Sequence, residues 1–246
     1  MRCPAVRFSS GDRLPPAVPE FPDADARNVL EPGCARCPEL VAARARIAWG
    51  NGSLDADVMV VGEAPAFGNP PAEAESAVGG RARGDESDAE RWRGGNWTGL
   101  AYTARHSGRL IRELFADAGL DADDLYFTNA VKCFPAAEDE GDGSPTNREP
   151  TADERANCRN HLATEIDQVD PAVIAATGKH ATRSVLGEAA PESFVDSVLD
   201  PVDAPTFETV VVPLLHPSYQ NVWLPRIGYD REEYVAAIGA RVAAHR

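Results

Sequence analysis

Four cysteines of this chain fall in a pattern that could bind a metal. Cys34 and Cys37 form a C-x2-C pair, and Cys133 and Cys158 follow singly, much later in the sequence. Four thiolates gathered from three segments would suit a tetrahedral zinc ion or an iron–sulfur cluster, and the spacing does not choose between the two. Four scattered, buried thiols are the alternative. Cys3 lies in a proline-rich stretch and is the cysteine that we expect not to bind the metal.

Three polar residues follow apolar runs and could also do chemistry. Glu63 lies in a Gly-Glu-Ala-Pro turn, Asn129 lies in a Thr-Asn-Ala-Val segment, and His216 begins a His-Pro-Ser-Tyr segment. A carboxylate can move a proton, an amide can recognise a pattern of hydrogen bonds, and an imidazole can donate to a developing negative charge. Taken singly, each could be an ordinary turn, strand-end or loop residue.

The apolar runs predict the scaffold that positions these groups. Four runs have the composition of buried parallel strands: 57–62, 125–131, 172–178 and 209–215. Four helical patterns lie between or after them: 107–118 with Ser107 as N-cap, 151–168, a helix from Lys179, and 230–245. This alternation predicts an α/β fold, a three-layer α/β/α sandwich with a central, mostly parallel four-stranded sheet. The carboxyl ends of the strands would bring the three polar residues to one edge.

Composition divides the chain into an arm and a domain. Residues 1–33 are rich in proline and lack periodicity, so they predict an extended N-terminal arm over a domain of residues 34–246. Within that domain, an insert at about 66–100 and an acidic segment at 136–149 interrupt the alternation, and both predict surface loops.

The charge is strongly acidic and spread along the chain. There are 39 Asp and Glu residues against 24 Lys and Arg, a net charge of −15 at pH 7. Such a surface either disfavours anionic partners or suits a salt-rich cytosol, and we favour the second, halophile-like interpretation because about 1 M salt leaves a Debye length of only ~3 Å. No run reaches the roughly 18 apolar residues of a membrane span, and no signal-peptide pattern is present. We therefore expect a cytoplasmic monomer without membrane contact.

The order of these motifs resembles the uracil-DNA glycosylase superfamily, in particular its iron–sulfur families 4 and 5. The resemblance covers residues from about 34 to 225 and is strongest at three segments: Val60-Val-Gly-Glu-Ala-Pro65, Thr128-Asn-Ala-Val-Lys-Cys133 and His216-Pro. It implies a [4Fe-4S] cluster as the cofactor, with four ligands: Cys34, Cys37, Cys133 and Cys158.

The resemblance implies a DNA repair enzyme that acts on uracil-containing DNA. Such an enzyme flips uracil into a pocket and hydrolyses the N-glycosidic bond, leaving an abasic site for base excision repair. Asn129 would read the edge of the base, because its amide accepts the N3 proton and donates to O4. Tyr102 would cover the flipped ring, and Gly62 and Ala64 of the first loop would line the uracil site.

The resemblance also implies catalytic and DNA-contacting residues. His216 would donate to O2 of the leaving uracil anion, and Glu63 would position or polarise the attacking water. Trp223 or Leu224 would insert into the duplex as a wedge, with Arg226 on a phosphate.

Several departures from the family pattern leave alternatives open. The most active members of the superfamily carry an Asp where this chain has Ala64. Either Glu63 is the sole carboxylate of the site, or Glu73 or Glu75 folds back from the long insert. His106 is either a second catalytic group or an ordinary residue at the start of a helix.

The predicted enzyme is monofunctional, because a β-lyase needs an amine and the chain has two lysines, one beside Cys133 and one at a helix start. Two rival hypotheses remain. The first is a glycosylase for another deaminated base such as hypoxanthine. The second is a catalytically silent iron–sulfur protein that binds DNA.

Overall fold

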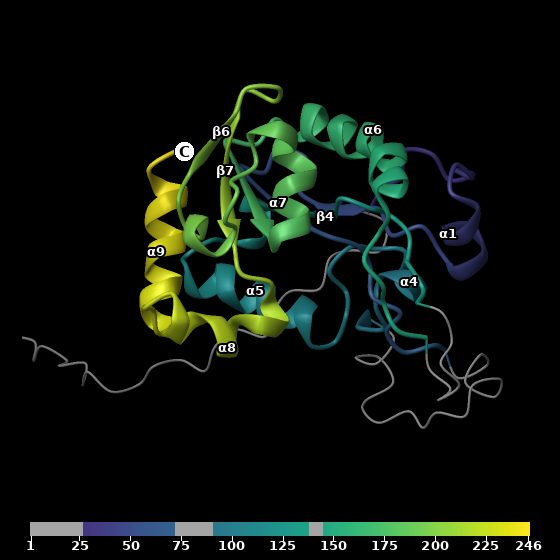
Figure 1. The fold of residues 1–246 in the computed structure, drawn as a ribbon, viewed down its shortest axis with the longest axis horizontal. Helices are drawn as coiled ribbons and strands as arrows, with labels where there is room; N and C mark the ends of the chain where they lie inside the picture. Colours follow the sequence, from purple (N-terminus) through teal and green to yellow (C-terminus); the bar gives the residue numbers. More distant parts are fainter. Residues whose placement is uncertain (1–26, 72–90, 138–144) are drawn as a thin grey trace, which may run out of the picture.

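A seven-stranded sheet runs through the part of the chain that the computed structural model describes, residues 27–71, 91–137 and 145–246 (Figure 1). Its strand order is β1-β2-β4-β3-β5-β7-β6. The strands are β1 (Arg27–Asn28), β2 (Gly50–Gly52), β3 (Val58–Gly62), β4 (Leu125–Asn129), β5 (Val173–Thr177), β6 (Val202–Ala204) and β7 (Thr209–Leu214).

The four predicted strands are the four central ones. β4, β3, β5 and β7 lie side by side and are parallel, and their β-branched and aromatic residues suit a sheet buried on both faces. The predicted count of four is too small, because three short antiparallel strands extend the sheet: β1 and β2 beyond β4, and β6 beyond β7. The sequence Gly50-Asn-Gly52 has little intrinsic strand preference, so pairing with β4 rather than propensity makes it a strand.

Helices cover both faces of this sheet, which confirms the three-layer sandwich. The described helices are α1 (Pro38–Ala43), α4 (Gly95–Thr98), α5 (Ser107–Asp117), α6 (Ala152–Val169), α7 (Lys179–Leu186), α8 (Gln220–Trp223) and α9 (Arg231–Ala243). One apolar core joins the sheet to α5 and α9, and a second joins its other face to α6 and α7 (Figure 1).

Helix boundaries follow their capping signals. Thr151 and Glu154 form the predicted capping box of α6, and Asp230 and Glu233 form another on α9. The predicted N-cap of α5 was wrong by one residue: Ser107 is the first helical residue, and His106 holds the cap position without a side-chain cap bond.

The described structure begins inside the predicted N-terminal arm. Arg27 and Asn28 already pair with β2, so the sheet includes residues that precede Cys34. Residues 1–26 of the arm, 72–90 of the insert with Glu73 and Glu75, and 138–144 of the acidic segment lie outside the described residues. No helix in the described ranges is long and apolar enough to cross a bilayer.

Candidate active site

A pocket of about 780 Å³ opens where the central strands end. β3, β4, β5 and β7 run parallel, so the residues that follow them meet at one edge of the sheet. The pocket lining includes all the residues predicted to bind or cleave the uracil nucleotide: Gly62, Glu63, Ala64, Tyr102, Asn129 and His216. His106, the possible second catalytic group, is exposed and does not line it.

Gly62 allows two functional side chains to approach the end of β3. A Cβ atom on this residue would lie 2.5 Å from Asn129 Oδ1 and 2.7 Å from the Tyr102 hydroxyl, closer than real side chains come. The loop after Gly62 is also bound to the segment after β4, since the Ala130 N–H donates to Gly62 O and the Val131 N–H donates to Glu63 O. Hydrogen bonds therefore join the Gly62-Glu-Ala-Pro65 loop to the segment after Asn129.

Asn129 is the last residue of β4 and is only 4% exposed. Its Nδ2 has no hydrogen-bond partner among the described residues. A buried donor without an acceptor costs about 1–3 kcal/mol. Because Asn129 lines the pocket, an acceptor on a bound ligand would satisfy it.

Tyr102 is held by its hydroxyl and by its ring. Its oxygen lies 2.5 Å from Thr177 Oγ1, which itself donates to Val61 O at 3.3 Å, so the tyrosine is the donor to the threonine. The ring packs edge-on against Phe127. Burial raises the pKa of Tyr102, so the phenol is neutral. Thr177 was not among the predicted site residues, although its place at the end of a predicted strand was a signal for it.

His216 follows β7 and is half-buried. The Ser218 N–H donates to His216 Nδ1 at 3.3 Å. Burial lowers the pKa of His216, which favours the neutral ring. A neutral imidazole that accepts at Nδ1 carries its proton on Nε2.

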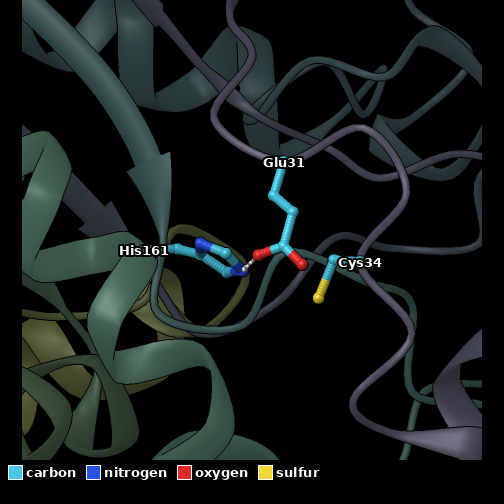
Figure 2. A group of neighbouring side chains, drawn as sticks. All are labelled: Glu31, Cys34 and His161. Atoms are coloured by element: carbon cyan, nitrogen blue, oxygen red, sulfur yellow. Dashed lines mark ion pairs between the residues drawn. The ribbon is translucent and has the colours of Figure 1, made fainter.

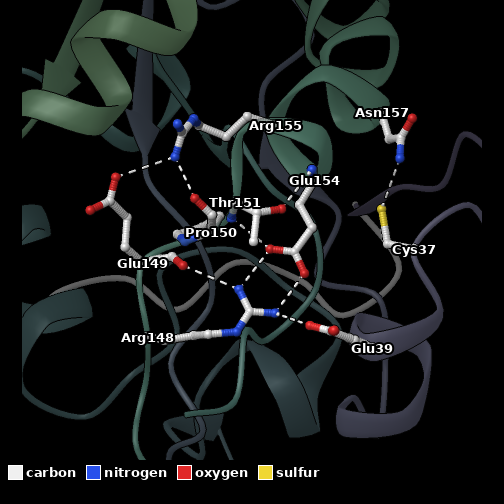
Figure 3. Close-up of polar contacts among 9 residues, drawn as sticks. All are labelled: Cys37, Glu39, Arg148, Glu149, Pro150, Thr151, Glu154, Arg155 and Asn157. Carbon is white, nitrogen blue, oxygen red and sulfur yellow. Dashed lines mark hydrogen bonds and ion pairs between the residues drawn. The ribbon is translucent and has the colours of Figure 1, made fainter.

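Glu63 is half-buried near a second carboxylate, Glu149, which was not among the predicted site residues. Burial raises the pKa of Glu63, and the charge of Glu149 raises it further, while Arg155 acts in the opposite direction. Glu149 Oε1 lies 2.9 Å from His180 Nδ1. It also lies 3.3 Å from Arg155 Nη1 (Figure 3). The acidic segment predicted as a surface loop thus contributes to the electrostatics of the pocket.

The end of this segment also connects the pocket to the cysteines. Arg148 pairs with Glu154 at 2.6 Å and with Glu39 of α1 at 3.1 Å (Figure 3). Asn147 donates to Pro65 O at 3.1 Å. These contacts connect the end of the acidic segment both to the loop that contains Pro65 and to α1, the helix that follows Cys37.

The four predicted metal ligands are free thiols that lie near one another. Cys37, Cys133 and Cys158 share a small apolar cluster with Leu40 and Val131. The pKa of Cys133 is raised to about 11, first by burial and then by neighbours that include Cys158 and Cys34. Arg44 donates to Cys133 Sγ at 3.1 Å and Asn157 donates to Cys37 Sγ at 3.5 Å. Such donors would stabilise thiolate ligands.

Comparison with known proteins decides the family. The model of the uracil DNA glycosylase superfamily matches residues 49–239. The chain belongs to the uracil-DNA glycosylase superfamily. It is 31% identical over 186 residues to a type-4 uracil-DNA glycosylase of Thermotoga maritima, covering 76% of this chain and 77% of the relative. It is 34% identical over 181 residues to a type-5 uracil-DNA glycosylase of Pyrobaculum aerophilum, covering 62% and 65%.

In this superfamily member, the residues of the segment after His216 differ in how exposed they are. Trp223 lines the pocket, and Arg226 stacks over its ring at 4.8 Å. Leu224 is 6% exposed and belongs to the core beneath the sheet, so it is not free to insert into a duplex. Tyr219 and Val222 are instead exposed, at 60% and 53%.

A second group of possible metal ligands lies next to the cysteines of this glycosylase-family chain. Ligand atoms of Glu31, Cys34 and His161 lie within 4.8 Å of one another (Figure 2). Arg36 already engages two of them, Glu31 Oε2 at 2.7 Å and His161 Nε2 at 2.9 Å. Burial and Arg36 lower the pKa of His161, so its neutral ring accepts this bond. Since Arg36 engages Glu31 and His161, Cys34 is the residue of this group that we expect to bind a metal.

The chemistry of the donor set fits a metal held by thiolates. Four free cysteines lie near one another, and side chains donate to the sulfurs of Cys133 and Cys37. Such a set suits either a tetrahedral zinc ion or an iron–sulfur cluster.

Proposed function

We propose that this protein excises uracil from DNA by hydrolysing the N-glycosidic bond, and leaves an abasic site. One observation carries the proposal: an amide, an aromatic ring, a neutral imidazole and a carboxylate converge on one pocket at the strand ends. The names of the type-4 and type-5 relatives support the same activity.

Recognition would depend on Asn129. Uracil presents an N3–H donor and an O4 acceptor on the same edge, and a carboxamide complements both. The unpaired, buried Nδ2 of Asn129 supplies the donor for O4. Cytosine presents the opposite pattern and would leave the amide unsatisfied. Tyr102, fixed by Thr177, would hold its ring against the base, and the close walls of Gly62 and Ala64 would limit the size of that base.

Catalysis would use His216 and Glu63. As the bond between C1′ and N1 breaks, positive charge develops on the sugar and negative charge on uracil O2. The His216 Nε2–H would donate to that oxygen, and a preorganised donor of this kind is typically worth several kcal/mol. Glu63 would accept a proton from water as it attacks C1′, which yields the abasic sugar and the uracil anion, and the anion then takes up a proton from solvent.

DNA would be held by the segment that follows His216. Trp223, which lines the pocket, would fill the space that the flipped nucleotide leaves, and Arg226 would contact a phosphate. The exposed side chains of Tyr219 and Val222 extend the same surface.

A [4Fe-4S] cluster would be held by four cysteines: Cys34, Cys37, Cys133 and Cys158. When bound, it would supply a structural cross-link between three segments of the chain and no step of the hydrolysis. Iron and acid-labile sulfide in anaerobically purified protein would test this, with Cys158→Ser expected to lose both and Cys3→Ser to keep both. A colourless preparation that contains zinc would contradict the proposal.

The proposed activity is tested by excision from labelled single- and double-stranded oligonucleotides across a salt series. Uracil-containing strands should become alkali-labile at that position, and the acidic surface predicts activity at salt concentrations that abolish binding by basic proteins. Cleavage of hypoxanthine but not uracil would indicate another base, and binding without excision at any salt would indicate a silent DNA-binding protein.

A further inference from the structure

Lys132 is a fully buried lysine whose ammonium has three oxygen partners. Its side chain is 1% exposed, and Nζ lies 2.5 Å from Glu165 Oε2, 2.7 Å from Thr128 Oγ1 and 2.6 Å from the main-chain oxygen of Asn129. Three N–H donors are thus matched by three acceptors. Arginine could not reproduce this arrangement, because its donors lie in one plane.

Glu165 completes the network from α6. Oε2 also accepts from Thr128 Oγ1 at 2.5 Å, and Oε1 accepts from the Gly50 N–H at 3.1 Å. The carboxylate thereby joins α6 to β4 and to the neighbouring strand β2. Buried ion pairs are weak contributors to stability, because desolvation offsets their attraction. This pair therefore calls for an explanation beyond stability.

The position of the Lys132–Glu165 network next to Asn129 supplies such an explanation. β4 ends at Asn129, so its carbonyl lies where the regular strand ladder stops. The Lys132 main chain is fixed as well, since its carbonyl accepts from the Ala48 N–H at 2.7 Å and its N–H bonds the Cys158 thiol. The lysine is thus held in place and in turn holds the peptide group of the base-reading residue.

We propose that Lys132, held by Glu165, is a positioning residue that fixes the orientation of Asn129 in the pocket. The inference rests on the proposed function, in which Asn129 reads uracil. Lys132 does not line the pocket, so it would act through Asn129 and not on the substrate.

The test compares two double variants in which a cation becomes Met and an acid becomes its amide. Lys132→Met/Glu165→Gln removes both buried charges together and leaves neither unpaired. Arg231→Met/Asp117→Asn removes an exposed pair between α9 and α5 and serves as the control. Each protein is measured for thermal unfolding, iron content, affinity for free uracil by equilibrium dialysis, and single-turnover excision.

We expect the buried double variant to stay folded and keep its iron, yet to lose affinity for free uracil. Its excision rate should fall about 100-fold, as misplacement of a group near the chemistry can cause. The control should match the wild type in all four measurements. A folded, iron-containing Lys132→Met/Glu165→Gln protein with wild-type uracil affinity and rate would overturn the inference.

A second variant covers the case in which the double variant does not fold. Thr128→Val keeps the ion pair and the side-chain shape but removes one acceptor of the ammonium and one donor to Glu165. It should weaken uracil binding, and unchanged affinity and rate in this variant would also overturn the inference. Wild-type protein that excises no uracil would instead contradict the proposed function.

Discussion

The Ser218 main-chain N–H donates to His216 Nδ1 at 3.3 Å, and this bond leaves the ring proton on Nε2. Burial lowers the pKa of His216, so the ring stays neutral at physiological pH. A neutral donor at the end of β7 is suited to a developing anion, because it needs no counter-charge in the resting pocket.

Replacing His216 should slow excision and leave DNA binding intact. His216→Gln is expected to lower the single-turnover rate about 100- to 1000-fold, the usual effect of losing one oxyanion donor. His245→Gln, at an exposed position after α9, is the control and should have no effect. A similar loss in both variants would argue against a catalytic role.

Asn129→Asp should abolish the preference for uracil. The carboxylate keeps the shape of the amide but loses the donor for O4 and places negative charge against that oxygen. Excision should fall at least as much as binding of free uracil, and Asn160→Asp on the exposed face of α6 should be silent. Wild-type excision by Asn129→Asp would remove Asn129 from the recognition scheme.

Gly62→Ala should disturb base recognition without unfolding the protein. The new methyl group would overlap Asn129 Oδ1 and the Tyr102 hydroxyl, so one of the two must shift. Uracil affinity should fall about tenfold or more, since loss of one good hydrogen bond to a ligand is worth about 1.4 kcal/mol. Gly33→Ala meets no atom within 4 Å and should leave affinity unchanged.

Glu149→Gln should move the acid limb of the pH–rate profile. Ionised Glu63 is the proposed base, so the rate falls as pH drops through its pKa, which burial and then Glu149 raise. Removing the charge of Glu149 lowers that pKa, and the fall in rate should begin at a lower pH. A limb that stays in place would show that another group controls it.

Glu63→Gln should trade activity for stability. A carboxyl whose pKa is raised in the folded protein contributes stability at pH values below its ordinary pKa of 4.5. That contribution is lost as the pH rises through the pKa of the group in the folded protein. The variant should therefore melt above the wild type at pH 7, with the difference vanishing below pH 4.5. Its excision rate should be about 100-fold lower.

Sequence pattern predicted the parts of the fold that depend on local chemistry. The β-branched runs mark the four central strands, and the Thr151–Glu154 capping box marks the start of α6. The pattern could not predict β1, β2 and β6, because these short strands depend on pairing with a neighbouring strand and not on their own residues.

The pocket was predictable where a residue ended or followed a strand, as Asn129 ends β4 and as Glu63 and His216 follow β3 and β7. Glu149 was missed because its proximity to Glu63 depends on how the segment before α6 folds back. Leu224 was proposed as a wedge because apolar residues can insert into DNA. Only the tertiary structure shows that this leucine packs in the hydrophobic core.

The spacing of Cys158, His161 and Glu165 places all three on one face of α6. The first belongs to the proposed metal centre, the second engages Arg36 beside Cys34, and the third holds Lys132 next to Asn129. A single helix tends to open as one cooperative unit. Amide exchange along this face of α6 should therefore report one opening free energy, and the protein would lose its metal centre and its ability to read a base in the same event.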